Sequence, residues 1–164
     1  MALNSYLVVV GEKQGTIKGG VIQKGREGWI EINAYHHEVV SPRDASSGLA
    51  TGRRQHKPFV FTMDIDVSVI AFYNAFINGE KLKTVEVKCF SPQRTGASGG
   101  GVETLHFTIL LTNAAIVSME NEMLNNNDPA LVNFEKRITI ALVYESIQWT
   151  WVQGNKSAQD SFNP

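Results

Sequence analysis

The stretch Glu103-Thr-Leu-His-Phe-Thr-Ile-Leu-Leu111 decides the fold class. Its odd positions from 105 to 111 are all apolar, whereas positions 104, 106 and 108 carry threonine or histidine. Successive side chains of an extended chain point to opposite faces, so this spacing places the apolar groups on one face. The stretch is therefore predicted to be a half-buried β-strand.

The same alternation recurs on both sides of this stretch. In 82–90, Val85, Val87 and Cys89 alternate with polar residues, and 137–144 has the same period. Further strands are expected at 5–10, 29–33, 35–40, 57–65, 114–120 and 147–152. Many short strands separated by turn residues predict a mainly β barrel or sandwich rather than βαβ units.

One segment has a helical period instead. Within 66–79, Val69, Phe72, Tyr73 and Phe76 form a stripe at a spacing of three or four residues, with Ile70 and Ile77 beside it. A carboxylate or hydroxyl at Asp66 or Ser68 can accept hydrogen bonds from the first-turn amides, and Gly79 can end the helix in a left-handed conformation. A single helix beside the sheets is expected.

The composition suits one globular domain over residues 1–164. The chain is 43% hydrophobic and 19% charged, with a formal net charge of -1. This charge gives no general attraction to nucleic acid, and it leaves association between copies unopposed. The single cysteine, Cys89, has no partner for an internal disulfide and is expected to be a small buried hydrophobe.

The N-terminal residues suggest where the protein folds. They lack a basic region before the short apolar run at 7–10, and no stretch reaches the ~18 apolar residues of a membrane helix. Folding in the cytoplasm is expected, and any export is expected to proceed without a signal peptide.

Three segments are predicted to be loops. Residues 41–57 form a long run without a secondary-structure pattern, and such runs in compact domains are usually functional or disordered. Residues 91–101 are predicted to be a glycine-rich hairpin end, and 153–164 a polar tail. Arg43, Arg53 and Arg54 in the long run, with their charges and the flexible residues between them, favour docking onto a protein surface over binding nucleic acid.

Catalytic, metal and cofactor motifs are weak or missing. His36 and His37 are adjacent, so on a strand they point to opposite faces and do not converge on one ion. Asp64 and Asp66 could share a strand face as an acid–base pair, although a strand end and a helix cap are the simpler interpretation. The glycine runs match no phosphate-binding pattern. No catalytic residue, metal or cofactor is predicted.

The run from His37 to Pro58 (His-Glu-Val-Val-Ser-Pro-Arg-Asp-Ala-Ser-Ser-Gly-Leu-Ala-Thr-Gly-Arg-Arg-Gln-His-Lys-Pro) resembles the central signature of the Hcp family. These haemolysin-coregulated proteins are the tube subunits of the bacterial type VI secretion system. The resemblance extends in the same order through four more blocks: the turn 16–19, the helix 66–79, the strand 109–116 and the closing strand 144–151.

The resemblance implies a fold and a function. It implies two antiparallel sheets forming a β-barrel with one external α-helix, and a non-enzymatic subunit of hexameric rings that stack into a hollow secreted tube. It also implies sheath, spike and effector proteins as partners, with effectors carried in the lumen. The expected ring-stacking residues are Ser41, Pro42, Arg43, Asp44, Ser47, Gly48, Thr51, Gly52, Arg53 and Arg54. The candidates for the lumen wall are Glu86, Lys88, Arg137 and Thr139.

Two alternatives remain open from the residues. A monomeric carbohydrate-binding module could use Trp29, Trp149 and Trp151 as a stacking platform. A small β-barrel hydrolase could use Asp64, Asp66 and His106, provided that they converge in a pocket. A monomer in solution would favour either alternative, and a hexamer would disfavour both.

Overall fold

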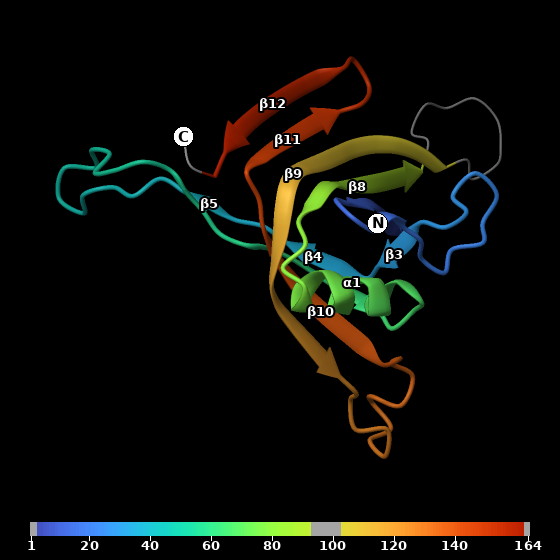
Figure 1. The fold of residues 1–164 in the computed structure, drawn as a ribbon. Helices are drawn as coiled ribbons and strands as arrows, with labels where there is room; N and C mark the ends of the chain where they lie inside the picture. The colour runs from blue at the N-terminus through green and yellow to red at the C-terminus, as the bar shows by residue number, and fades with distance from the viewer. Residues whose placement is uncertain (1–2, 93–102, 163–164) are drawn as a thin grey trace.

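The computed structural model describes residues 3–92 and 103–162, and within them the chain is mainly β with one helix (Figure 1). The helix is α1 (Ser68–Ile77). The strands are β1 (Ser5–Gly11), β2 (Gly15–Ile17), β3 (Ile30–Ile32), β4 (Ala34–His36), β5 (Val39–Val40), β6 (Gln55–His56), β7 (Phe59–Asp64), β8 (Leu82–Pro92), β9 (Glu103–Glu122), β10 (Arg137–Val143), β11 (Ser146–Trp151) and β12 (Lys156–Ser161).

Two antiparallel sheets share the long strand β9. One contains β2-β1-β8-β9-β11-β12, with β3 also paired to β1, and the other contains β9-β10-β7-β4. The strands predicted separately at 103–111 and 114–120 are this one strand, which bends from one sheet to the other (Figure 1). It pairs with β11 up to Thr112 and with β10 from Ala115, and Asn113 between them has a φ of 50°. The segment 30–36 joins the sheets a second time, because β3 pairs with β1 and β4 pairs with β7.

The core lies between the two sheets, as the alternation predicts. Leu7, Val87 and Ile109 are aligned across β1, β8 and β9, and each is buried. Phe61 on β7 meets Phe72 of α1, with 6.0 Å between ring centroids. Hydrophobic burial in this layer is the main favourable term for the fold.

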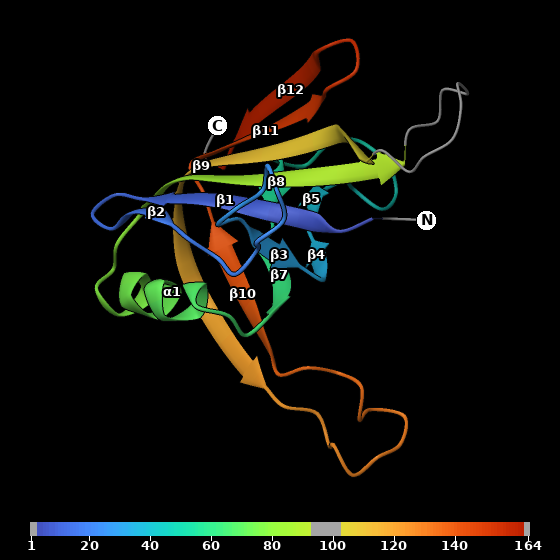
Figure 2. The same ribbon diagram turned by 90° about the vertical axis from the view of Figure 1, so that its right-hand side faces the viewer.

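The helix lies beside β10 and the second half of β9, on the opposite side of the molecule from β12 (Figure 2). Asp66 accepts a hydrogen bond from the Ser68 amide at 2.8 Å and another from the Ser68 hydroxyl, and Gly79 follows the helix at φ 61. The predicted apolar stripe is only partly right. Phe76 is 42% exposed, because the buried side is centred on Val69, Phe72 and Ala75.

One predicted loop is wrong, and the loop predicted at 41–57 is right except at Gln55–His56. The expected polar tail contains β12, which pairs with β11 from Ser146↔Ser161 to Trp151↔Lys156. The expected run 41–57 lies in a hydrogen-bonded hairpin that includes β5 and β6. The glycine-rich hairpin end expected at 91–101 lies, from residue 93 onward, outside the described residues. No helix in the described part of the chain is long and apolar enough to cross a membrane.

Candidate assembly surfaces

A hairpin that projects from the body is the most distinctive feature of the molecule. We call residues 39–56 the arm; it consists of β5, β6 and the segment between them (Figure 1). Backbone hydrogen bonds join its two sides. At the base, the Lys57 amide donates to the Glu38 carbonyl at 2.9 Å, and nearer the tip, the Thr51 amide donates to the Pro42 carbonyl at 3.0 Å. Every residue from 43 to 55 is exposed. The arm therefore has a defined backbone but buries little surface within its own chain.

The tip of the arm is ordered by one carboxylate. Asp44 accepts hydrogen bonds from the amides and the hydroxyls of both Ser46 and Ser47, at 2.6–3.1 Å. These bonds, led by the Ser46 hydroxyl, hold the pKa of Asp44 well below its usual range. Arg43 donates to the Gly48 carbonyl at 3.1 Å. Charged residues predicted to meet another ring are thus held in a fixed turn.

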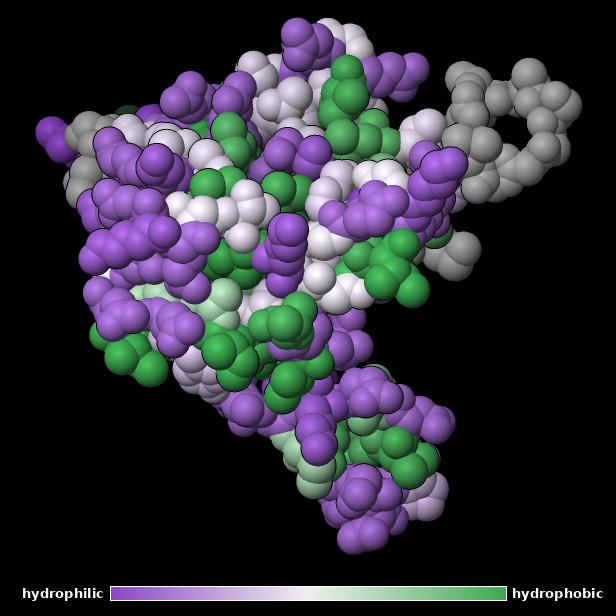
Figure 3. All heavy atoms as spheres, turned by 45° about the vertical axis from the view of Figure 1, so that its right-hand side comes forward, coloured by the Kyte–Doolittle hydropathy of each residue, from purple (hydrophilic) through white to green (hydrophobic). Residues whose placement is uncertain are grey.

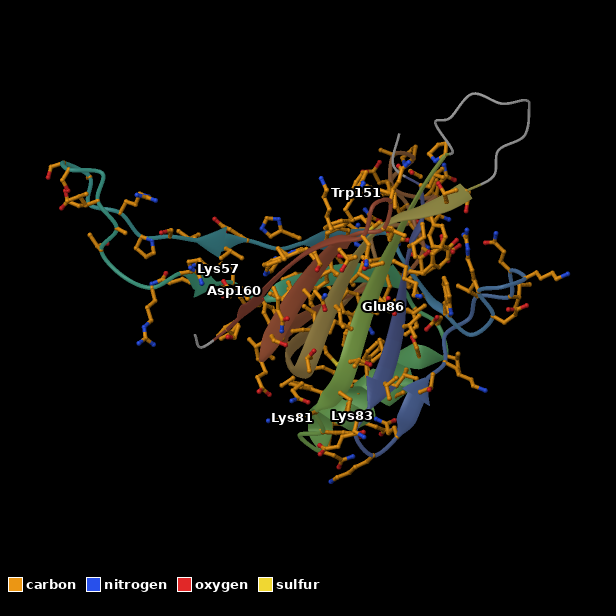
Figure 4. All side chains as sticks on the ribbon, turned by 90° about the horizontal axis from the view of Figure 1, so that it is seen from above. Lys57, Lys81, Lys83, Glu86, Trp151 and Asp160 are labelled. Atoms are coloured by element: carbon orange, nitrogen blue, oxygen red, sulfur yellow. The ribbon has the colours of Figure 1, made fainter. Side chains whose placement is uncertain are left out.

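Five side chains form a polar network where the arm meets the body, which we call the base network. Tyr144 Oη lies 2.6 Å from His37 Nε2 and 2.7 Å from His56 Nδ1. His56 Nε2 lies 3.0 Å from Asp160 Oδ2, and Arg54 binds both oxygens of Asp160 at 2.7 and 3.0 Å. The labelled Asp160 lies beside the base of the arm, close to Lys57 (Figure 4).

The pKa values in the base network are shifted in consistent directions. The Arg54 guanidinium and the His56 ring hold the pKa of Asp160 well below its usual range, so it is a carboxylate. Burial, with the neighbouring His56 and His36, lowers the pKa of His37 from 6.5 and favours its neutral form. Burial and the Asp160 charge raise the pKa of Tyr144. Arg54 was predicted to contact the next ring, but its guanidinium already binds Asp160 of the same chain.

The residues proposed for a lumen wall lie on two different sheets. Glu86 and Lys88 point outward from β8, with Lys88 Nζ and Glu86 Oε2 3.6 Å apart. Arg137 and Thr139 point outward from β10 in the other sheet, where Arg137 pairs with Glu122 at 2.9 Å. The structure therefore does not bring the four residues onto one surface.

Exposed apolar side chains occur on the helix side of the molecule and on the loop between β9 and β10. Several green groups are visible on one face, and some of them lie on the mostly purple loop that projects at the bottom (Figure 3). The exposed residues are Ile65, Val67, Ile70, Phe76 and Ile77 around α1, and Met123, Val132 and Phe134 in or near the loop. Exposed apolar surface of this kind is typical of interfaces between proteins.

The groups considered for sugar binding do not assemble. Trp29 packs against Tyr6 and Phe90, Trp149 lies near His37, and Trp151 contacts His106. The three tryptophans therefore sit in three separate ring clusters rather than on one platform.

The groups considered for catalysis or metal binding do not assemble either. Asp64 binds Asn33 and Asp66 binds Gly20, both beside one surface pocket that His106 does not line. Among the described residues, no group of three or more His, Cys, Asp or Glu side chains is placed to hold a metal ion. His37 instead bonds Tyr144.

Comparison with known proteins agrees with this geometry. The family model for "Type VI secretion system effector, Hcp" matches residues 6–151. The "Major exported protein" of Pseudomonas aeruginosa is 33% identical over 174 aligned residues, which cover 100% of this chain and 98% of that protein.

Solved structures are similar over nearly the whole chain. A crystal structure of an Hcp protein has a TM-score of 0.87 at 28% identity, covering 99% of this chain and 98% of its own. Hcp1 from the E. coli EAEC 042 pathovar has a TM-score of 0.83 at 31% identity, covering 98% of this chain and 99% of its own. Together, the match over residues 6–151 and these likenesses show that the chain belongs to the Hcp family of the type VI secretion system.

Proposed function

We propose that this chain is a non-enzymatic tube subunit that forms hexameric rings, and that the rings stack into a hollow tube exported by the type VI system. The observation that carries the proposal is the arm, a defined projection that extends well beyond the body and buries little within its own chain. Its partners in this proposal are other copies of itself, sheath and spike proteins, and effectors carried in the lumen.

The edges of the larger sheet support the proposal of ring closure. Within the described residues β12 pairs only with β11, and β2 pairs only with β1 at the other edge. Exposed strand edges present unpaired amides and carbonyls that recruit a further strand. If the β12 edge of one subunit meets the opposite edge of the next, the contact is heterologous and can close into a ring.

This arrangement selects one set of lumen residues. If the larger sheet continues from subunit to subunit, its inner face is covered by the core of each subunit. Its outer face is then free to form the wall of the lumen. Glu86 and Lys88 lie on that outer face. Glu86 is aligned with Val8 on β1 and Leu110 on β9, and Lys88 is aligned with Tyr6 and Thr108 on the same two strands. We therefore favour Glu86 and Lys88 over Arg137 and Thr139 as residues of the lumen wall.

Stacking is assigned to the arm. Its exposed charges, Arg43, Asp44 and Arg53, are the groups expected to meet the next ring. Exposed ion pairs contribute only about 0–1 kcal/mol each. Rings are therefore expected to be stable in dilute solution while stacking remains weak and salt-sensitive.

The experiment is light scattering coupled to size exclusion, followed by negative-stain imaging. We expect a hexamer and annular particles, which form tubes at high concentration. Arg53→Glu is expected to keep the hexameric mass and to reduce stacking, whereas Lys83→Glu, an exposed charge reversal on β8, serves as the control. A monomer at micromolar concentration would contradict the ring. Stacking of Arg53→Glu rings at the wild-type level would contradict the role of the arm.

A further inference from the structure

We propose that the base network fixes the direction of the arm, with Asp160 and Tyr144 as its positioning residues, so that the C-terminal strand controls whether the arm can stack. The consequence for stacking rests on the proposed function, but the control of the arm itself does not. The network joins elements far apart in sequence: His37 precedes β5, Arg54 and His56 belong to the arm, Tyr144 lies between β10 and β11, and Asp160 lies on β12.

The arm needs such a support because of its shape. A hairpin of two short strands is marginal by itself in water. The arm has only two-residue strands at its base, joined through Val39↔His56 and Val40↔Gln55. The His56 side chain at this base is fully buried. Side-chain bonds at this point therefore determine the angle at which the arm leaves the body.

The hydrogen bonds of the network form one consistent chain of donors. Asp160 is a carboxylate and can only accept, so His56 donates to it from Nε2. With Nε2 donating, His56 Nδ1 has an acceptor role open to the Tyr144 hydroxyl, and the Tyr144 oxygen can in turn accept from His37 Nε2. The Asp160 carboxylate accepts from both His56 and Arg54, so loss of its charge weakens these bonds and leaves fewer acceptor sites for the two donors.

The strand β12 is itself held in part by this contact. Both of its faces are largely polar, and it pairs with β11 alone among the described strands. Phe162, just beyond it, packs edge-on against Tyr144 at 5.4 Å and lies 5.9 Å from the His56 ring, measured between ring centroids. A ring neighbour that covers the β12 edge would hold Asp160 in place. Ring closure would thereby fix the arm before rings stack.

The test is amide hydrogen exchange across residues 38–57 in Asp160→Asn. Charge-assisted bonds contribute more than neutral ones, so their loss is expected to speed exchange at the arm base, including the Lys57 amide, by about tenfold. Asp64→Asn is the matched control, because it removes an equal charge from an exposed carboxylate bonded to Asn33 on the other sheet. Exchange in the arm of this control is expected to match the wild type.

A second variant keeps the test decisive if Asp160→Asn disturbs the body. Arg54 is 55% exposed in its side chain, so Arg54→Gln removes one partner of Asp160 without opening the core. Faster exchange confined to 38–57 in either variant, with β1 and β8 unchanged, supports the proposal. Wild-type exchange in the arm of a folded Asp160→Asn and of Arg54→Gln would overturn it.

Stacking is measured separately by sedimentation of concentrated rings. The proposal expects folded Asp160→Asn to keep the hexameric mass and to form shorter or fewer tubes than Asp64→Asn. If the wild type itself never stacks, the proposed function fails, while the exchange result still decides whether the base network positions the arm. If exchange rises but stacking equals the wild type, the control of stacking by the C-terminal strand is refuted.

Discussion

Removal of one hydroxyl group at Tyr144 provides a sharp test of the base network. Tyr144→Phe leaves the ring in place, and the residue is 4% exposed, so little packing changes. In this variant His56 Nδ1 loses its hydrogen-bond partner. Because the His56 side chain has no exposed surface, water cannot replace that partner, and the loss costs about 1–3 kcal/mol. The bond to the half-buried His37 adds roughly 0.5–1.5 kcal/mol. The free energy of unfolding is expected to fall by roughly 1.5–4.5 kcal/mol.

The assay is urea unfolding at equal chain concentration, because any association between copies would stabilise the folded chain by mass action. The same loss corresponds to a melting temperature lower by about 3–18 °C, at roughly 2–4 °C per kcal/mol for a chain of this size. Tyr73→Phe is the control, since no hydrogen bond of the described residues uses the Tyr73 hydroxyl, and a change within about 0.5 kcal/mol is expected. A loss for Tyr144→Phe no larger than that of Tyr73→Phe would refute the reasoning.

Two further predictions concern acid and the lumen. Glu80 has a lowered pKa because the Gln14 and Lys13 amides donate to it, so its stabilisation is present above its unfolded value of 4.5 and is lost as pH falls through the folded pKa. Glu80→Gln is expected to weaken the dependence of the urea unfolding midpoint on pH between pH 6 and 3. An unchanged slope of midpoint against pH would contradict this. A cysteine at Glu86 is expected to be shielded in tubes from a thiol reagent too large for the lumen, whereas one at Thr139 reacts; equal reaction would contradict the lumen assignment.

Much of the fold could be predicted from the sequence, because the main strands bury one face. The segments predicted at 5–10, 82–90 and 137–144 correspond to β1, β8 and β10 within two residues at each end. The helix was found for the same reason, from apolar residues at a helical period. The apolar stripe predicts a buried side that includes Phe76, with Ile77 beside it, but both of these apolar residues are exposed. An apolar stripe does not distinguish burial within a chain from surface left exposed in a single subunit.

The base network could not be found from sequence patterns. Its members lie between residues 37 and 160 and come from different elements, and no spacing rule connects them. From the sequence, His37 is considered only as a metal ligand beside His36, and His56 receives no role of its own. Tyr144 is considered there only as the end of the alternating stretch 137–144 and the start of the closing strand 144–151. The single available signal was the resemblance around 37–58, which marked the segment as important without showing what holds it.

The elements that sequence reasoning missed share a physical property that bears on function. They are β2, β6 and β12: two edges of the larger sheet and one side of the arm. Strands are recognised in a sequence through burial against their own chain, and β12 (Lys-Ser-Ala-Gln-Asp-Ser) has no apolar face to recognise. Such a strand gains little from burial in one subunit, so its order depends on backbone pairing and polar contacts such as Asp160 with His56. Strands of this kind at the edges are expected where the missing partner is another subunit, and this is why the least predictable segments are those to which assembly is assigned.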